Sequence, residues 1–227
     1  DVCSSDLVND IIGYSLPVSA KLGLVATVFA MLLGVYLGIV AALNQGKWPD
    51  KLCMFISTIG ITVPSFVIAT LLIYVFAIKF SLFHAIGLES PMDYVLPSIA
   101  LGASSMAFVA RLGRSALLDV IRSDYIRVAR AKGLSKNTVI YKHALRNSLI
   151  PIVTYIGPLL AAVLTGSFVI EGLFGIPGMG REFITSITNR DYTVIIGFVT
   201  LDATFLVLSN FVVDILYAVI DPRIKME

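Results

Sequence analysis

The hydrophobic positions of this chain gather in five long stretches that are separated by shorter polar connections. The stretches cover residues 18–43, 54–78, 94–118, 148–170 and 192–220. Each is long enough to cross the hydrocarbon core of a bilayer as an α-helix, which takes about 20 residues. Only helices fit, because lipid offers backbone amides no partners and the alternation that a barrel needs is missing. We therefore predict an all-α membrane protein with five transmembrane helices.

The composition supports a membrane protein over a soluble domain. Hydrophobic residues make up 57% of the chain and charged residues 14%, with a mean hydropathy of +0.90. So little polar surface does not cover a soluble globule. Within the first stretch, Gly34 and Gly38 have the spacing that lets two helix backbones approach closely. The pattern leaves open whether their partner is a helix of this chain or of another.

The basic residues predict the orientation in the membrane, because Lys and Arg concentrate in cytoplasmic connections. They lie in the connection at residues 44–51, in the region 111–147 and in the C-terminal tail, three segments that alternate correctly to share one side. The other connections, at residues 79–93 and 171–191, hold three basic and five acidic residues. We expect these two to face outward and the C-terminus to be cytoplasmic.

Residues 111–147, called the basic region below, differ from the rest of the chain. They hold 9 of its 17 Lys and Arg residues. Helical periodicity runs up to Gly133, with Ser123 or Asp124 placed to cap the first helix and Gly133 suited to a left-handed C-terminal position. Ser135 then reads as the N-cap of a second helix that turns Val139, Ile140, His143 and Ala144 inward. The pattern predicts helix, glycine turn, helix.

The basic region resembles the EAA loop of ABC-importer permeases, most closely those for dipeptides, oligopeptides and nickel complexes. The similarity rests on the run DYIRVARAKGL at residues 124–134, on HALRN at 143–147 and on Pro151. Arg127, Val128 and Ala129 stand where the general pattern has Glu and two Ala, a departure typical of the peptide branch. The resemblance implies a cytoplasmic coupling loop at about residues 119–147, which contacts an ATP-binding subunit.

The resemblance assigns roles to particular residues of that loop. The subunit contact would be made by Asp124, Tyr125, Arg127, Val128, Ala129, Lys132, Gly133 and Leu134. Support for the loop would come from His143, Arg146, Asn147 and Pro151.

Two other segments also match the family, and both would line the translocation path or its outer gate. One holds Pro64, Ser65 and Phe66, with a proline that bends a helix. The other is rich in glycine and resembles a V-E-x-x-F-x-x-P-G-x-G segment; its candidates are Glu171, Phe174, Pro177, Gly178 and Gly180. From residue chemistry alone we add Asp202, a costly carboxylate inside the last stretch. Near the end of that stretch, Asn210, Asp214, Tyr217 and the closing Asp221-Pro222-Arg223 also match the family, with a structural role.

The resemblance also implies partners: two ATP-binding subunits, a second homologous permease subunit and an extracytoplasmic substrate-binding protein, at a bacterial inner membrane. The sequence G-x-x-x-x-G-K-[ST] is absent, so ATP and Mg²⁺ would sit on the partner subunits and this chain is no enzyme. No metal site or disulfide is expected from Cys3 and Cys53.

The resemblance bears on the ends of the chain as well. The family has six spans, so the five stretches are expected to be the last five of a truncated chain. Residues 1–7 read as a non-native leader, which leaves residues 8–227 as the permease domain.

Other functions compete with a peptide importer. The same machinery imports nickel chelates or sugars in other members. An ion-coupled secondary transporter or channel would use Asp202 and Lys21 as coupling charges, but it leaves the turn at Gly133 unexplained. A third hypothesis makes the basic region a patch for anionic lipid or nucleic acid. The spacing of Gly133, HALRN and Pro151 favours the importer.

Overall fold

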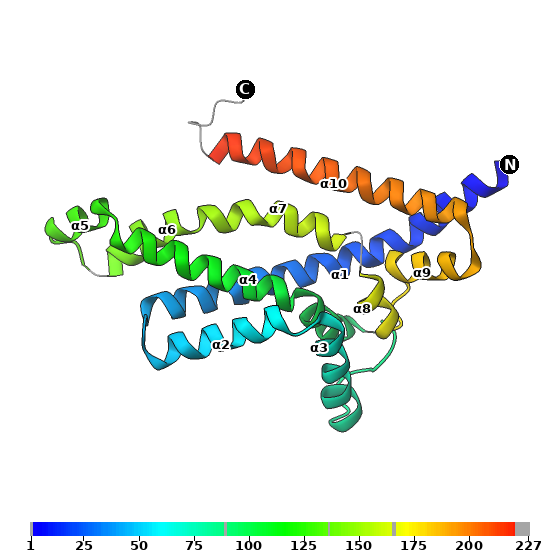
Figure 1. Cartoon of the computed structure of the whole chain (residues 1–227), viewed down its shortest axis with the longest axis horizontal. Coiled ribbons are helices and arrows are strands. Elements are labelled where there is room, and N and C mark those ends of the chain that lie inside the picture. The colour runs from blue at the N-terminus through cyan, green and yellow to red at the C-terminus, as the bar shows by residue number, and fades with distance from the viewer. Residues whose placement is uncertain (1, 89, 136, 165–166, 221–227) are drawn as a thin grey trace. The chain divides into compact units, whose positions relative to one another are not determined.

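The apolar stretches form helices in the computed structural model, which describes residues 2–88, 90–135, 137–164 and 167–220. Helices make up nearly all of this described part, and it contains no strand. The elements in chain order are α1 Val2–Leu43, α2 Trp48–Thr62, α3 Ser65–Leu72, the π-helix η1 Ile73–Lys79, the 3₁₀-helix η2 Pro91–Tyr94, α4 Val95–Arg122, α5 Asp124–Ala131, the π-helix η3 Thr138–Ala144, α6 Leu145–Ser148, α7 Ile150–Leu164, α8 Phe168–Leu173, α9 Met179–Asn189 and α10 Tyr192–Ile220 (Figure 1).

Two of the described helices are long and apolar enough to cross a membrane by themselves, over residues Val8–Leu43 and Pro91–Arg122. A third crossing results if Trp48–Thr62 and Ser65–Lys79 together make one span. Residues Tyr192–Leu208 form a shorter apolar helix. The predicted all-helical architecture is thus present, whereas the number of five crossings stays a prediction.

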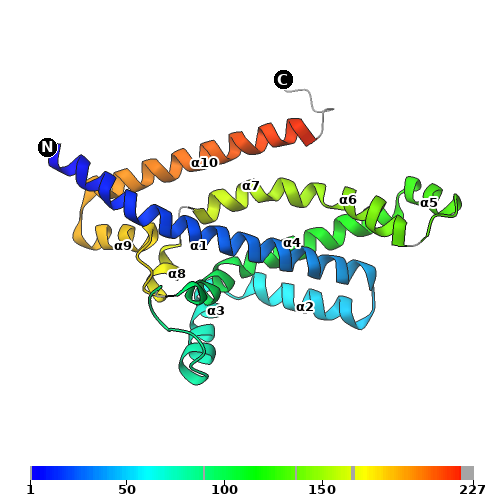
Figure 2. The same cartoon turned by 180° about the vertical axis from the view of Figure 1, so that it is seen from behind.

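The chain divides into two compact units, which are described separately. One, called the coupling unit, comprises residues 30–62 and 104–156; the other, called the cap unit, comprises residues 1–29, 63–103 and 157–227. In the coupling unit, a short turn joins the end of α1 to α2, so these two segments run antiparallel as neighbours (Figures 1 and 2).

The parts of α1, α2 and α4 that lie in the coupling unit are called the stem below. Within it, α1 packs closely on α4. A Cβ built on Gly34 would lie 2.7 Å from the Met106 carbonyl oxygen, and one on Gly38 would lie 2.8 Å from the Ala110 carbonyl oxygen. Only glycine allows the backbones to approach this closely. The two glycines therefore pack against a helix of the same chain, which answers the question that their spacing left open.

A small apolar cluster ties the basic region to this stem. Its buried members are Ala42 of α1, Leu117 and Leu118 of α4, Ile126 of α5, and Val139 and Ala144 of η3. The cluster anchors α5 by one residue, since Ile126 is fully buried while its helix neighbours are exposed or half-exposed. The basic region is thus packed on the stem from one side only.

Two apolar clusters lie among the described residues of the cap unit. The larger joins Leu22 of α1, Ala69 of α3, Leu96 and Ala100 of α4 and Ile170 of α8, with Phe174 and Ile176 from the segment that follows α8. The smaller joins Val8 of α1 to α9 and α10 through Met179, Val194 and Phe198. The short helices after residue 167 are therefore built into the unit.

Two of the predicted continuous spans are interrupted. The second was predicted over residues 54–78 with a bend, but α2 ends at Thr62 and α3 begins at Ser65 after an extended Pro64. Proline disfavours helical backbone at the residue before it and lacks an amide proton, so the helix stops. The fourth was predicted over 148–170, but α7 is described only to Leu164 and an extended Ser167 caps a new helix, α8.

Candidate functional site

The basic region forms the helix, turn and second helical segment that its sequence predicts. Helix α5 covers Asp124–Ala131, and Ser123 occupies its N-cap position with extended backbone. The Ser123 hydroxyl, however, donates to the Val120 carbonyl oxygen at 2.6 Å and does not cap the helix. After α5, Gly133 has a φ of +79°, the left-handed conformation that its position predicts.

The second segment also starts as expected, because the Ser135 hydroxyl accepts a hydrogen bond from the Thr138 amide at 3.3 Å. It continues as π-helix η3 and then as α6. Val139, Ile140 and Ala144 are buried and His143 is half-buried. The inward face that the periodicity predicts is therefore present, although much of the segment has wider π-helical turns.

A long-range hydrogen bond joins the two halves of the region. The Asn147 side-chain amide of α6 donates to the Tyr125 hydroxyl of α5 at 2.7 Å. Both residues were predicted for the coupling loop in different roles, and the structure brings them together. Of the other predicted supporting residues, Arg146 and Pro151 are exposed.

The outer face of α5 and its turn is open and mixed in character. Tyr125, Val128 and Leu134 are apolar or aromatic and are 43%, 54% and 41% exposed. Exposed Asp124, Arg127 and Lys132 surround them, and Ala129 is half-buried. A small apolar patch with charged neighbours is the composition of a protein contact surface.

A partly buried ion pair that the sequence did not reveal connects two helices of the coupling unit. Arg114 of α4 reaches Asp50 of α2 with two hydrogen bonds, 2.7 and 2.8 Å long. The Asp50 carboxylate also accepts from the Gly46 amide at 2.8 Å and is only 4% exposed. The bidentate geometry fixes α2, its preceding turn and α4 relative to one another.

The glycine-rich segment folds around the carboxylate of Glu171, which is fully buried. One carboxylate oxygen accepts from the Ser19 hydroxyl of α1 at 2.8 Å. The other accepts from the backbone amides of Gly180 at 2.8 Å and Arg181 at 3.3 Å, at the N-terminus of α9. Burial raises the pKa of the Glu171 carboxyl, while the hydrogen bonds from Ser19 and from the backbone lower it. We call this arrangement the glutamate clamp.

Two side chains next to the glutamate clamp, Ser19 and Arg181, connect it to the surrounding backbone. Ser19 donates to Glu171 and accepts from the Met179 amide at 2.8 Å, so it connects α1 to α9. The Arg181 guanidinium donates to the Gly175 carbonyl oxygen at 3.0 Å. Ser19 had no motif to mark it, because its partner lies 152 residues away.

The remaining predicted path residues lie in the cap unit. Phe174 is buried in the larger core, whereas Pro177 is exposed. Pro64 is exposed, Ser65 is half-buried and Phe66 is 50% exposed, all at the start of α3. The side chains of Asn210, Asp214 and Tyr217, and all of residues 221–223, fall outside what the structure describes.

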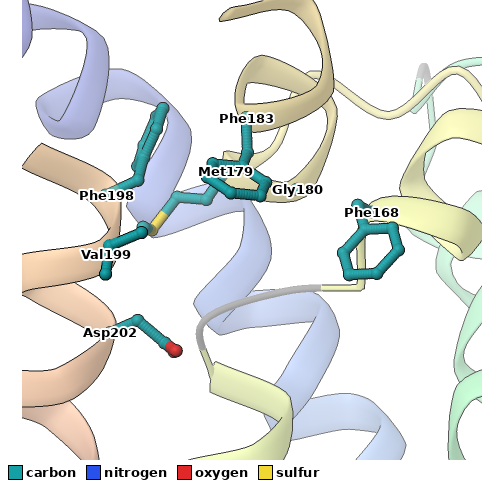
Figure 3. Close-up of a pocket in the computed structure, with 7 residues that line it drawn as sticks. All are labelled: Phe168, Met179, Gly180, Phe183, Phe198, Val199 and Asp202. Carbon is teal, nitrogen blue, oxygen red and sulfur yellow. The ribbon is translucent and has the colours of Figure 1, made fainter. Parts of the chain in front are cut away.

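A cavity of about 160 Å³ opens between α8, α9 and α10 of the cap unit (Figure 3). Its lining is made by Phe168, Met179, Gly180, Phe183, Phe198, Val199 and Asp202. The rings of Phe183 and Phe198 meet edge to face, with centroids 6.3 Å apart. Asp202, predicted as a path residue from its charge, thus stands in a predominantly apolar and aromatic wall.

Comparison with known proteins adds to this geometry. Residues 34–226 match the family model described as the binding-protein-dependent transport system inner membrane component. The chain is 48% identical over 223 residues to the dipeptide transport system permease protein DppB of Bacillus subtilis (strain 168), which covers 98% of this chain and 72% of that protein. It is 45% identical over 220 residues to the oligopeptide transport system permease protein OppB of Haemophilus influenzae (strain ATCC 51907 / DSM 11121 / KW20 / Rd), covering 96% and 72%.

Solved structures share the fold at lower sequence identity. An amino acid ABC transporter crystallised with histidines matches with a TM-score of 0.74 and 18% identity, covering 95% of this chain and 97% of that one. The MetNI methionine ABC transporter in an inward-facing conformation matches with a TM-score of 0.74 and 19% identity, covering 93% and 96%. These solved structures show the fold, and the family match together with the curated permease relatives shows that the chain belongs to the family of binding-protein-dependent transport system inner membrane components and is a permease subunit of an ABC importer.

Proposed function

We propose that this permease imports dipeptides or oligopeptides and that its α5 surface is where an ATP-binding subunit docks. The cargo is supported by relatives that are named dipeptide and oligopeptide permeases and are 41–48% identical to this chain. The docking role is supported by the open, mixed surface of α5 on a well-anchored stem. This surface is the observation that carries the proposal.

The proposed arrangement in the membrane has five crossings. They are α1, the broken pair α2 and α3 with η1, α4, α7 and α10. The basic region lies on the cytoplasmic side, as the distribution of Lys and Arg favours. The glycine-rich segment with α8 and α9 then lies on the outer side, where a substrate-binding protein delivers cargo.

Force from the ATP-binding subunit reaches the crossings through short connections. One residue, Ser123, separates α4 from α5, and one residue, Leu149, separates α6 from α7. The Tyr125–Asn147 hydrogen bond and the buried Ile126 make α5 move with both of them. A displacement of α5 is therefore expected to displace α4 and α7 as well.

The mechanism follows from this linkage. Two ATP-binding subunits bind ATP and Mg²⁺ and close on one another, which draws together the α5 helices of this chain and of a second permease subunit. Closure favours one state of a bundle that has two, so the pathway switches from inward-facing to outward-facing. The outer segments, with Pro64, Phe66, Pro177 and Asp202 at exposed positions, form the gate and path.

Other cargo and other energy sources make different predictions. An importer of nickel chelates or sugars would have the same coupling surface, so only uptake assays with each cargo separate it from a peptide importer. Membership in a binding-protein-dependent family favours ATP-driven import over an ion-coupled transporter.

Replacing Gly133 by valine tests the coupling role. A Cβ built at position 133 would have no other atom within 4 Å, so the substitution acts only through the left-handed backbone conformation. A residue with a Cβ pays roughly 1–2 kcal/mol of conformational free energy to adopt it. We expect ATP-driven uptake of a labelled dipeptide by the reconstituted transporter to fall about tenfold, while membrane insertion and ATP hydrolysis persist. Gly133→Asn is the matched control, because asparagine adopts the left-handed conformation more readily than valine and is expected to keep most of the uptake. Normal uptake by Gly133→Val, or an equal loss in both variants, contradicts the proposal.

A further inference from the structure

The cavity between α8, α9 and α10 has the chemistry of a site for a cation. Three phenyl rings line it, those of Phe168, Phe183 and Phe198, together with the thioether of Met179. Asp202 supplies the one carboxylate among its described lining residues, none of which is basic (Figure 3). The wall therefore carries a negative charge in a mainly apolar setting.

That charge needs a partner. Asp202 belongs to α10, one of the proposed crossings, and inside a bilayer a carboxylate on a helix costs up to about 2.5–3.5 kcal/mol on insertion scales. Apolar walls lower the local dielectric, which strengthens the attraction between the carboxylate and any cation that enters. The faces of phenyl rings also attract cations. An ammonium group pairs with the carboxylate and is attracted to the ring faces, whereas a neutral group leaves the carboxylate unpaired and an anionic group is repelled by it.

The size of the cavity limits how much of a ligand enters. Its volume of about 160 Å³ is below the range of roughly 300–1,000 Å³ that is usual for complete small-molecule sites. It therefore holds one end or one side chain of a larger molecule. Resting on the proposed peptide transport, we propose that this cavity is the subsite that receives a primary ammonium group of the transported peptide, paired with Asp202.

The ammonium group has two sources in a peptide, the N-terminus and a lysine side chain. The experiment uses the assembled transporter in lipid nanodiscs, with Cys3→Ser, Cys53→Ser and the reporter Val199→Cys. Val199 lines the cavity and is 54% exposed, so its replacement is accessible. The reporter is treated with a cationic methanethiosulfonate, the 2-aminoethyl reagent, or with the anionic 2-sulfonatoethyl reagent of similar size.

The cationic reagent is expected to modify the reporter about tenfold faster than the anionic one, relative to their rates with a free thiol. Adding Asp202→Asn is expected to bring the ratio of the two modification rates, each divided by that reagent's rate with a free thiol, close to one. Asp10→Asn, which removes an exposed carboxylate of α1 that does not line the cavity, is expected to leave the ratio unchanged. An equal ratio with and without Asp202 overturns the proposal.

Peptides that protect the cysteine at position 199 from modification by the cationic reagent identify the source of the ammonium group. Trialanine has an N-terminal ammonium, N-acetyl-trialanine has none, and N-acetyl-Ala-Lys-Ala has only that of its side chain. Protection by trialanine assigns the N-terminus, protection by the acetylated lysine peptide assigns the side chain, and either must disappear with Asp202→Asn. Protection by N-acetyl-trialanine, or by no peptide, overturns the proposal.

Two further outcomes are separable. A reporter that neither reagent modifies in the assembled transporter means that a partner subunit fills the cavity, which overturns the subsite. ATP-driven dipeptide uptake is measured on the same complexes. Uptake without protection refutes the subsite and leaves the proposed function standing, whereas the absence of peptide uptake refutes the proposed function itself.

Discussion

At the scale of single residues, the glutamate clamp shows why the glycine-rich segment has its composition. A Cβ on Gly178 would lie 2.5 Å from both the Glu171 carboxylate and the Ser19 hydroxyl oxygen, and one on Gly180 would lie 2.5 Å from the Phe168 amide nitrogen. Gly178 is therefore required by close approach to a buried polar cluster, and Gly180 by close approach to the backbone at the start of α8. The carboxylate in turn satisfies amides at the start of α9, where negative charge is favourable.

Glu171→Ala tests the clamp. The variant leaves the Ser19 hydroxyl and the amides of Gly180 and Arg181 without the acceptor they use, and each buried unsatisfied group costs about 1–3 kcal/mol. We expect a loss of stability of about 3 kcal/mol or more, seen as a lower melting temperature in detergent. Glu171→Gln is the control, since it keeps one acceptor oxygen and is expected to lose less. Melting temperatures unchanged in both variants would show that the clamp is not stabilising.

Some of these residue roles were predictable and others were not. The left-handed Gly133 followed from its position after a short helical period, because the C-terminal end of a helix is a local property. The V-E-x-x-F-x-x-P-G-x-G segment directed attention to Glu171, but its partner Ser19 was not predicted. No local pattern pairs side chains that are 152 residues apart. The same reason hid the Phe-lined cavity around Asp202, whose walls come from three helices.

At the scale of elements, the sequence predicted where helices form better than where they break. The end of α1 matches the predicted Leu43 and the start of α10 matches the predicted Tyr192, because each boundary is set by a change between apolar and polar residues. The bend at Pro64 was predicted as a kink within one helix, yet the backbone there is extended. Whether a proline bends or ends a helix depends on the tertiary contacts of the residues after it, such as the buried Ala69 of α3.

The Asp50–Arg114 pair makes the stem rigid, and Arg114→Ala tests it. Truncation leaves the buried Asp50 carboxylate without its partly exposed ionic partner, and a buried group left unsatisfied in this way costs about 1–3 kcal/mol. We expect a markedly lower melting temperature and weaker coupling of uptake to ATP hydrolysis. Arg122→Ala serves for comparison, because exposed Arg122 makes only a 3.3 Å hydrogen bond to Gln45 and its loss is expected to change stability by less than about 0.5 kcal/mol. Equal melting temperatures for the two variants would show that the Asp50–Arg114 pair does not brace the stem.

At the scale of the whole molecule, the proposed function depends on the exposed surface of α5 and the turn that follows it. Ile126 anchors α5 in the apolar cluster and the Tyr125–Asn147 hydrogen bond joins α5 to α6, while Val128 and Leu134 remain open. A permease subunit that takes its energy from another polypeptide, as we propose for this chain, needs such a surface. Family membership supplies the class of machine, and the exposed α5 is the proposed point of attachment.

Photo-crosslinking from α5 tests this account most directly. A benzoylphenylalanine is placed at Val128 on α5 or at Tyr192, which is 70% exposed at the start of α10, and the complex is irradiated in native membranes. The account predicts that the probe at position 128 captures the ATP-binding subunit and that the probe at position 192 does not. Capture of that subunit from position 192, or its absence from position 128 in a complex that transports peptide, would contradict it.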